Sequence, residues 1–188
     1  MNDMKIDKDL SLKTDRFVLR APNKSDIPHI FDAAQHEGFT DGMLWDPPKT
    51  KAELEKPLMN SLKSWDAGEA YNFTIEDIST GEFIGRISIR HEVDKVYNVG
   101  FWTHPKHQSQ GVMTEALEEV LRFGFEKLSA DRIETCHALW NLGSEKVLKS
   151  NGFEFVRYIE QGYKKHGKWI EENLLAINRT VWLNSKLK

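Results

Sequence analysis

The residues best suited to chemistry lie where a strand-like segment, a short polar loop and an amphipathic helix follow one another. The strand-like segment ends at Thr103, the loop runs from Gln108 to Gly111, and the helix begins near Met113. Backbone N–H groups at the start of a helix lack an intrahelical partner and attract anions such as a pyrophosphate. A glycine at Gly111 lets phosphate oxygens approach the backbone. The pattern indicates a phosphate-binding loop, although an ordinary strand–loop–helix connection has the same spacing.

Three other features have a functional and a structural interpretation. His104 and His107 have an H-x-x-H spacing, but no carboxylate accompanies them in a helix, so we predict no metal site. Cys136 falls in a predicted core strand, where a free cysteine behaves as a small hydrophobe. Residues 42–48 are apolar and aromatic, and Trp45 among them either lines an acceptor site or packs in the core.

The composition is that of a soluble globular protein and gives no sign of a nucleic-acid or membrane partner. Of the 188 residues, 39% are hydrophobic and 29% charged, with a net charge of −3. Cys136 is the only cysteine, which fits a reducing cytoplasm. The first ten residues lack the apolar run of a signal peptide, and no run is long enough to span a bilayer. We therefore expect a cytoplasmic protein.

Periodicity predicts a mixed α/β fold in a single domain, residues 1–188, in which residues 1–11 form a loose lead-in. Strands are expected over 17–20, 71–76, 83–90, 97–103, 132–138, 155–160 and 169–177. Helices are expected over 26–34, 50–65, 113–128 and 144–150, with Ser25 as the N-cap of the first and a capping box from Thr50 to Glu53 opening the second. Gly162 and Gly167 mark turns between the last strands.

Five segments in order resemble the GNAT superfamily of N-acetyltransferases, and in particular its bacterial ribosomal-protein-alanine N-acetyltransferase branch. The phosphate loop is similar to the pattern Gln/Arg-x-x-Gly-x-Gly/Ala, with Gln108, Gly111 and Met113 at its three positions. The other segments are residues 14–20, 81–87, 100–105, and 141–144 leading to 151–153. Met113 and Ser109 depart from the pattern. The side chain of Met113 is larger than the glycine or alanine of the pattern and would limit how closely the phosphates pack against the loop.

The resemblance implies a splayed central mixed sheet of about seven strands flanked by about four helices, with acetyl-CoA as the co-substrate. The pantetheine arm would bond the end of the central strand, as an added strand does. Asn141 would contact this arm, and the Ser144 hydroxyl would protonate the leaving thiolate; both residue types also favour helix caps. The implied cofactor-binding residues are Phe101, Trp102, Thr103, Gln108, Ser109, Gln110, Gly111, Val112, Met113, Thr114, Asn141, Ser144 and Lys146.

The general base is the least defined part of this site. Asn98 stands where many relatives have a glutamate, and it is placed with Trp45 and Glu171 among the substrate-binding residues. Glu160, Tyr163 and Glu171 remain alternative bases. An α-amine with a pKa near 8 needs less help than a lysine near 10.4.

The implied reaction is acetyl transfer by direct attack of a primary amine, with a protein or peptide N-terminus, ribosomal or other, as the favoured acceptor. A small-molecule amine or antibiotic is the alternative acceptor, and a non-catalytic acyl-CoA-binding module is the alternative class. The sequence leaves open whether the protein forms a homodimer.

Overall fold

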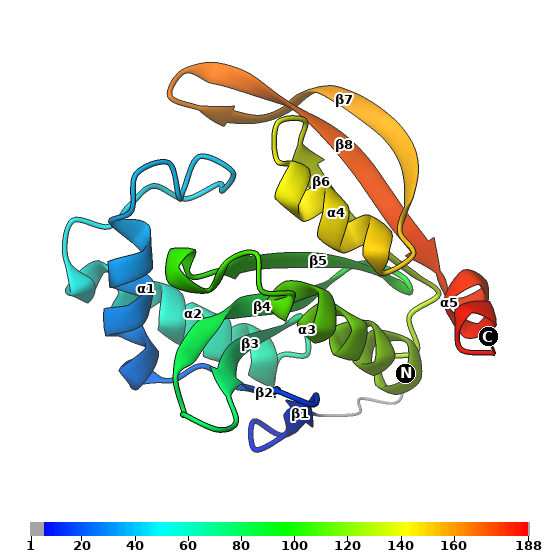
Figure 1. Ribbon diagram of the computed structural model, residues 1–188, viewed down its shortest axis with the longest axis horizontal. Coiled ribbons are helices and arrows are strands. Elements are labelled where there is room, and N and C mark those ends of the chain that lie inside the picture. The colour runs from blue at the N-terminus through cyan, green and yellow to red at the C-terminus, as the bar shows by residue number, and fades with distance from the viewer. Residues whose placement is uncertain (1–5, 188) are drawn as a thin grey trace.

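The computed structural model describes residues 6–187, which build one eight-stranded sheet with helices packed around it (Figure 1). The strand order is β1-β2-β3-β4-β5-β6-β8-β7. The strands are β1 Ser11–Lys13, β2 Phe17–Arg20, β3 Ala70–Asp77, β4 Phe83–Val93, β5 Val96–Thr103, β6 Arg132–Ala138, β7 Glu154–Lys165 and β8 Lys168–Asn178.

Five α-helices connect or follow these strands within residues 6–187. They are α1 Ile27–Ala34, α2 Glu55–Asp66, α3 Val112–Arg122, α4 Leu142–Ser150 and α5 Arg179–Ser185. Figure 1 shows α3 and α4 on the same side of the sheet, one beside each of the central strands β5 and β6.

One parallel pair interrupts an otherwise antiparallel sheet. Strands β5 and β6 pair in parallel only from Val96–Arg132 to Asn98–Glu134. Beyond Asn98 each strand continues, β5 to Thr103 and β6 to Ala138, without pairing to the other. The sheet therefore opens in its middle, and the backbone groups of the two strand ends face the opening.

The core that holds the opening in place lies between the sheet and α3. Buried residues of α3, among them Ala116, Leu117 and Val120, are fully covered. After α3 the chain makes a π-helical turn over Phe123–Lys127. A Cβ at Gly124 would lie 2.7 Å from the side chains of both Ile89 and Ile133, so the helix can approach the sheet here only with glycine. Burial of the apolar side chains between the sheet and α3 is a major favourable contribution to the free energy of folding.

The fold confirms the predicted mixed α/β class, with eight strands and five helices where about seven and four were expected. The short β1 and the C-terminal α5 are additional. Gly162 is not in a turn but inside β7, at a register shift between Ile159 and Tyr163.

Two predicted helix caps are wrong. Asn23, not Ser25, caps the start of the first helical segment, a 3-10 turn over Lys24–Asp26, by accepting the Ser25 N–H. Thr50 makes no capping bond, and its hydroxyl donates instead to the carboxylate of Glu53.

The predicted lead-in, residues 1–11, contacts the folded domain at Ile6 and is followed directly by a buried residue. The Ile6 carbonyl accepts a hydrogen bond of 3.0 Å from the buried Trp65 indole, and Leu12 is buried in β1. Residues 1–5 lie outside the described part of the chain.

Candidate active site

The loop between β5 and α3 has the geometry of an anion-binding site. Gly111 is the N-cap of α3, with a left-handed φ of +74°, and no side chain caps the helix. Ser109 is also left-handed, with a φ of +61°. The first-turn N–H groups from Val112 to Thr114 are therefore free to meet an anion.

Side chains from outside the loop fasten it. Arg16, just before β2, forms an ion pair of 2.7 Å with Glu115 and donates a 3.2 Å hydrogen bond to the Gln110 carbonyl. Gln108 Nε2 lies 3.4 Å from the Thr103 carbonyl. Met113 is 5% exposed and packs in the core, so its bulk lies among core side chains.

A cavity of about 1020 Å³ occupies the opening between β5 and β6. Its wall includes twelve of the thirteen residues predicted to hold the cofactor, Gln110 being the one it lacks. Alternating residues of β5 face opposite sides of the sheet. Trp102 and Gly100 share one face with their β4 partners Arg86 and Ser88, and Phe101 shares the other with Ile87. The cavity therefore reaches both faces of the sheet.

Helix α4 presents a free hydroxyl to this cavity. The Asn141 side chain caps α4 by accepting the Ser144 N–H at 3.1 Å. Ser144 Oγ makes no hydrogen bond to any residue of the described chain, and Ser144 lines the cavity together with the exposed Lys146.

His137 offers a buried acceptor at the same place. His137 Nδ1 lies 2.9 Å from the Ala138 carbonyl, so Nδ1 carries the proton of the neutral ring. Nε2 is then a buried acceptor without a partner among residues 6–187.

A family model described as "Acetyltransferase (GNAT) domain" matches residues 16–154, which is most of the chain. The chain belongs to the GNAT acetyltransferase family. It is 33% identical over 113 residues to the probable N-acetyltransferase YjcK of Bacillus subtilis (strain 168). That alignment covers 58% of this chain and 62% of YjcK, so the chain spans less than two thirds of that relative.

Solved GNAT structures share the fold over most of the chain. RimL, a ribosomal L7/L12 α-N-protein acetyltransferase in complex with coenzyme A, gives a TM-score of 0.82 at 19% identity, covering 90% of this chain and 98% of that one. The ribosomal-protein-S5-alanine acetyltransferase of Vibrio fischeri gives 0.79 at 19% identity, covering 93% and 99%. Within residues 6–187 no helix has the length and apolarity of a membrane span.

The far wall of this GNAT cavity is the loop between α1 and α2, and the β7–β8 hairpin holds it. The Tyr163 hydroxyl donates to the Asp41 carbonyl at 2.8 Å. Lys165 is 6% exposed, and its ammonium donates to the Trp45 carbonyl and the Asp46 carboxylate, each at 2.8 Å. Figure 1 shows the hairpin tip leaning toward this loop. These hydrogen bonds from Tyr163 and Lys165, here called the Tyr163 clamp, hold Trp45 at the cavity.

An aromatic cluster joins the loop to the sheet. Phe39 contacts the rings of Trp45 and Trp102 edge-on, at 6.4 and 5.3 Å between centroids. All three residues line the cavity. Trp45 therefore belongs to the cavity wall and is partly buried there, rather than enclosed in the main core.

The Tyr163 clamp leads to a prediction. Tyr163 does not line the cavity formed by the described residues, and burial raises the pKa of its hydroxyl. Tyr163→Phe is expected to cost about 1 kcal/mol of unfolding free energy, as one lost hydrogen bond does, and to change kcat less than about threefold. Chemical denaturation and steady-state kinetics test this. A loss of kcat near a hundredfold, at unchanged stability, would instead make Tyr163 a proton donor or acceptor in the reaction.

Three other residues proposed for the acceptor side also lie away from the cavity wall. Asn98 accepts a hydrogen bond from Arg90 at 3.1 Å, below the point where the sheet opens. Glu160 is exposed on β7, and Glu171 accepts a hydrogen bond from the Tyr158 hydroxyl. None of these three residues borders the cavity formed by residues 6–187.

Beside the exposed Glu37, the cavity wall contains a second carboxylate, Glu172, which the sequence analysis missed. It is partly buried, and that burial raises its pKa. Its carboxylate has no hydrogen bond or ion pair to any residue between 6 and 187. A Cβ on Gly162 would lie 2.1 Å from Glu172 Oε2, so glycine in β7 leaves the space that Glu172 fills.

Cys136 lies beside Glu172 on the same face, rather than in the core as predicted. It is partly exposed and lines the cavity. Burial, reinforced by the charges of Glu172 and Glu134, raises the pKa of its thiol to about 11. At neutral pH the group is a thiol, not a nucleophilic thiolate.

His104, set aside as a zinc ligand from the sequence, ties α1 to the phosphate loop. Its Nε2 lies 3.1 Å from the Asp32 carboxylate, which also accepts from Lys106 at 3.2 Å. His36 joins them in a group whose ligand atoms lie within 4.8 Å of one another. His104 Nδ1 accepts the Lys106 N–H, so Nε2 carries the ring proton and is engaged with Asp32. Hydrogen bonds within the protein thus engage His104 and Asp32, and the His36 ring contacts the His104 ring edge-on.

Proposed function

We propose that this chain transfers the acetyl group of acetyl-CoA to a primary amine by direct attack. The observation that carries the proposal is the cavity at the opening of the sheet. An uncapped helix N-terminus at Gly111, a free hydroxyl at Ser144 and an unpaired carboxylate at Glu172 all border it. These groups suit the pyrophosphate, the leaving sulfur and the attacking nitrogen, respectively.

The binding of acetyl-CoA would use backbone groups more than side chains. The pyrophosphate would accept the free N–H groups of Val112–Thr114, with Lys146 near the other phosphate. The pantetheine arm would pair with the unpaired end of β5 at Phe101–Thr103, where its amides meet backbone partners as a strand does. The buried Nε2 of His137 supplies an acceptor for one amide N–H.

The transfer itself requires three proton movements. The ammonium form of the amine gives one proton to Glu172, which later releases it to solvent, and the neutral nitrogen attacks the thioester carbonyl. As the C–S bond breaks, the departing sulfur takes a proton from Ser144 Oγ, and the second proton lost by the nitrogen restores the Ser144 hydroxyl, so that amide and free thiol are the products. The raised pKa of Glu172 brings its basicity closer to that of the amine, which favours proton acceptance.

An α-amine at the N-terminus of a protein or peptide is the acceptor we favour. Its pKa near 8 leaves a substantial neutral fraction at pH 7. RimL and the Vibrio fischeri enzyme, described as acetyltransferases of ribosomal proteins, share the fold and support this class. A small-molecule amine is the competing acceptor, because the fold alone does not select a substrate.

The alternative class is a module that binds acyl-CoA without turning it over. The combination of Ser144 and Glu172 at one cavity argues against it, because binding alone requires neither a free hydroxyl nor an unpaired carboxylate there.

A panel of amines and N-terminal peptides, read by release of free thiol from acetyl-CoA, tests the proposal. We expect turnover with α-amines, and a fall in kcat of about tenfold or more with little change in the KM for acetyl-CoA in Ser144→Ala. Because Asn141 makes the cap, the Ser144→Ala variant should keep its fold. CoA binding without thiol release from any amine would favour the binding module instead.

A further inference from the structure

Arg86 is a cation in the cavity wall that no side chain neutralises directly. It lies on β4, between Thr74 of β3 and Trp102 of β5, and is partly buried. Within residues 6–187 its guanidinium makes no hydrogen bond, ion pair or aromatic contact. Its five N–H donors are therefore available to whatever enters the cavity.

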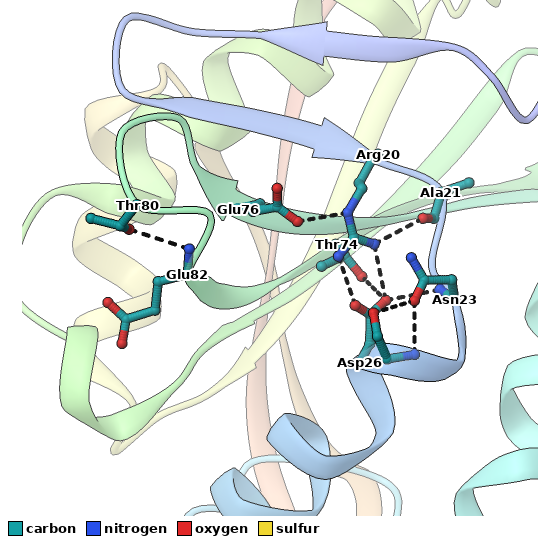
Figure 2. Close-up of polar contacts among 9 residues, drawn as sticks. Arg20, Ala21, Asn23, Asp26, Thr74, Glu76, Thr80 and Glu82 are labelled. Carbon is teal, nitrogen blue, oxygen red and sulfur yellow. Dashed lines mark hydrogen bonds and ion pairs between the residues drawn. The ribbon is translucent and has the colours of Figure 1, made fainter.

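Asp26, the carboxylate whose charge acts on Arg86, is already engaged. Asp26, 1% exposed, pairs with Arg20 at 2.8 Å and accepts from the Thr74 hydroxyl at 2.7 Å and the Asn23 N–H at 2.9 Å (Figure 2). Arg20 also pairs with Glu76 at 2.8 Å. Burial lowers the pKa of Arg86, and the charge of Asp26 partly offsets this effect without occupying the Arg86 donors. With one cation and two carboxylates, the Arg20–Asp26–Glu76 network has a net charge of −1.

Arg86 and Glu172 stand at opposite sides of the opening in the sheet, on the same face. The pair Arg86–Trp102 borders the opening on one side, and the pair Ala138–Glu172 borders it on the other. Trp102 and Ala138 each lie four positions after the last parallel pair, Asn98–Glu134. All four residues thus belong to one row across the sheet, interrupted where β5 and β6 separate.

The two charges in this row are both unpaired, and no ion pair joins them in the described chain. The backbones of β4 and β8 are three strand spacings apart, at least about 14 Å. Arg86 is therefore free to bind a group of the acceptor while Glu172 faces the amine.

We infer that the acceptor is an amine that also carries a carboxylate, and that Arg86 binds this carboxylate while the amine lies toward Glu172. The inference rests on the proposed acetyl transfer and adds a substrate class to it. A planar guanidinium binds a carboxylate with two parallel hydrogen bonds. The neighbours of Arg86 on this face, Asn72 and Ser88, are polar but neutral, so one positive charge matches one carboxylate.

The cofactor phosphates are not the anion for Arg86. Their predicted site is the start of α3. Helix α3 and the turn after it pack on the face of the sheet opposite to Arg86, because a Cβ at Gly124 in that turn would meet the Ile89 side chain. Ile89 and Arg86 differ by an odd number of residues along β4 and so point to opposite faces.

Matched acceptors test the inference. A dipeptide and its C-terminal amide differ only in the end carboxylate, and peptides with Asp or Asn at the second position differ only in an acidic side chain. For at least one pair we expect kcat/KM to be about 10- to 100-fold higher for the acid, the usual size of a charge-assisted bidentate contact. The pair that responds identifies the source of the carboxylate.

Arg86→Met should abolish this preference by lowering kcat/KM for the acid about 10- to 100-fold more than for the amide, and Arg86→Lys should retain part of it. Titration calorimetry of the same pairs onto the CoA-loaded protein measures the preference without turnover. If Arg86 only balances the Asp26 network, Arg86→Met will lower Tm and slow both members of a pair equally, and the inference fails. Equal affinity of acid and amide for the native protein also overturns it, whereas absence of turnover with every amine would overturn the proposed function instead.

Discussion

Replacing Gly111 with valine is expected to abolish the rise in Tm that CoA gives the native protein, while the variant stays folded. A ligand that binds only the native state stabilises it by about 2.7 kcal/mol at a concentration of 100 Kd. With a φ of +74°, Gly111 lets the chain turn into α3 with its first N–H groups uncovered. A branched side chain there would fill the space in which the pyrophosphate meets those groups, and we expect a loss of affinity of at least about a hundredfold.

Gly81 provides a matched control for the backbone strain. Its φ is +72°, and a Cβ there would meet no atom within 4 Å. Gly81 lies in the β3–β4 connection and does not line the cavity. Gly81→Val should therefore lower Tm by a similar amount and respond to CoA as the native protein does. If Gly111→Val also responds normally, the pyrophosphate does not bind at the start of α3.

Local sequence was sufficient to select residues that the fold brings to one cavity, twelve of the thirteen predicted cofactor residues. The loop and the helix after it are encoded by contiguous residues, and Asn141 and Ser144 are close in sequence, so the family resemblance could be recognised in short segments. Gln110 is the exception in the loop, because its carbonyl is bound by Arg16, far away in the chain. A contact of that kind has no signature in the loop itself.

The wall of the cavity formed by the loop after α1 and by β8 depends on contacts that sequence spacing does not reveal. Tyr163 and Lys165 reach the loop after α1 across more than a hundred residues. Neighbouring residues in a strand point to opposite faces, so a shift of one position separates Glu171, bound to Tyr158, from Glu172 in the cavity. The sequence signal for Glu172 is the two-residue period of its strand. This period places Glu172 at the cavity only when the pairing of Ala138 with Glu172 is known.

Glu172→Gln is expected to lower kcat/KM by about a hundredfold or more, the usual contribution of a general base, without lowering stability. Burial raises the pKa of Glu172, so the folded protein favours the neutral acid. The resulting stability is present below the unfolded pKa and is lost as pH rises through the folded pKa. Glutamine mimics the neutral acid. At neutral pH the Tm of the variant should therefore equal or exceed that of the native protein, and the difference should vanish toward pH 4.

The pH dependence of kcat/KM separates this base from the amine's own ionisation. An acceptor with no base to help it shows a rate that rises up to the amine's pKa, so this limb moves when an acceptor of pKa near 8 is exchanged for one near 10.4. A limb belonging to Glu172 stays fixed between acceptors and lies above 4.5, the ordinary glutamate value. Glu171→Gln, at the adjacent exposed position, should keep both limbs and most of kcat. If Glu172→Gln retains both the fixed limb and the native rate, the amine reacts without a carboxylate base, and the raised pKa reflects burial alone.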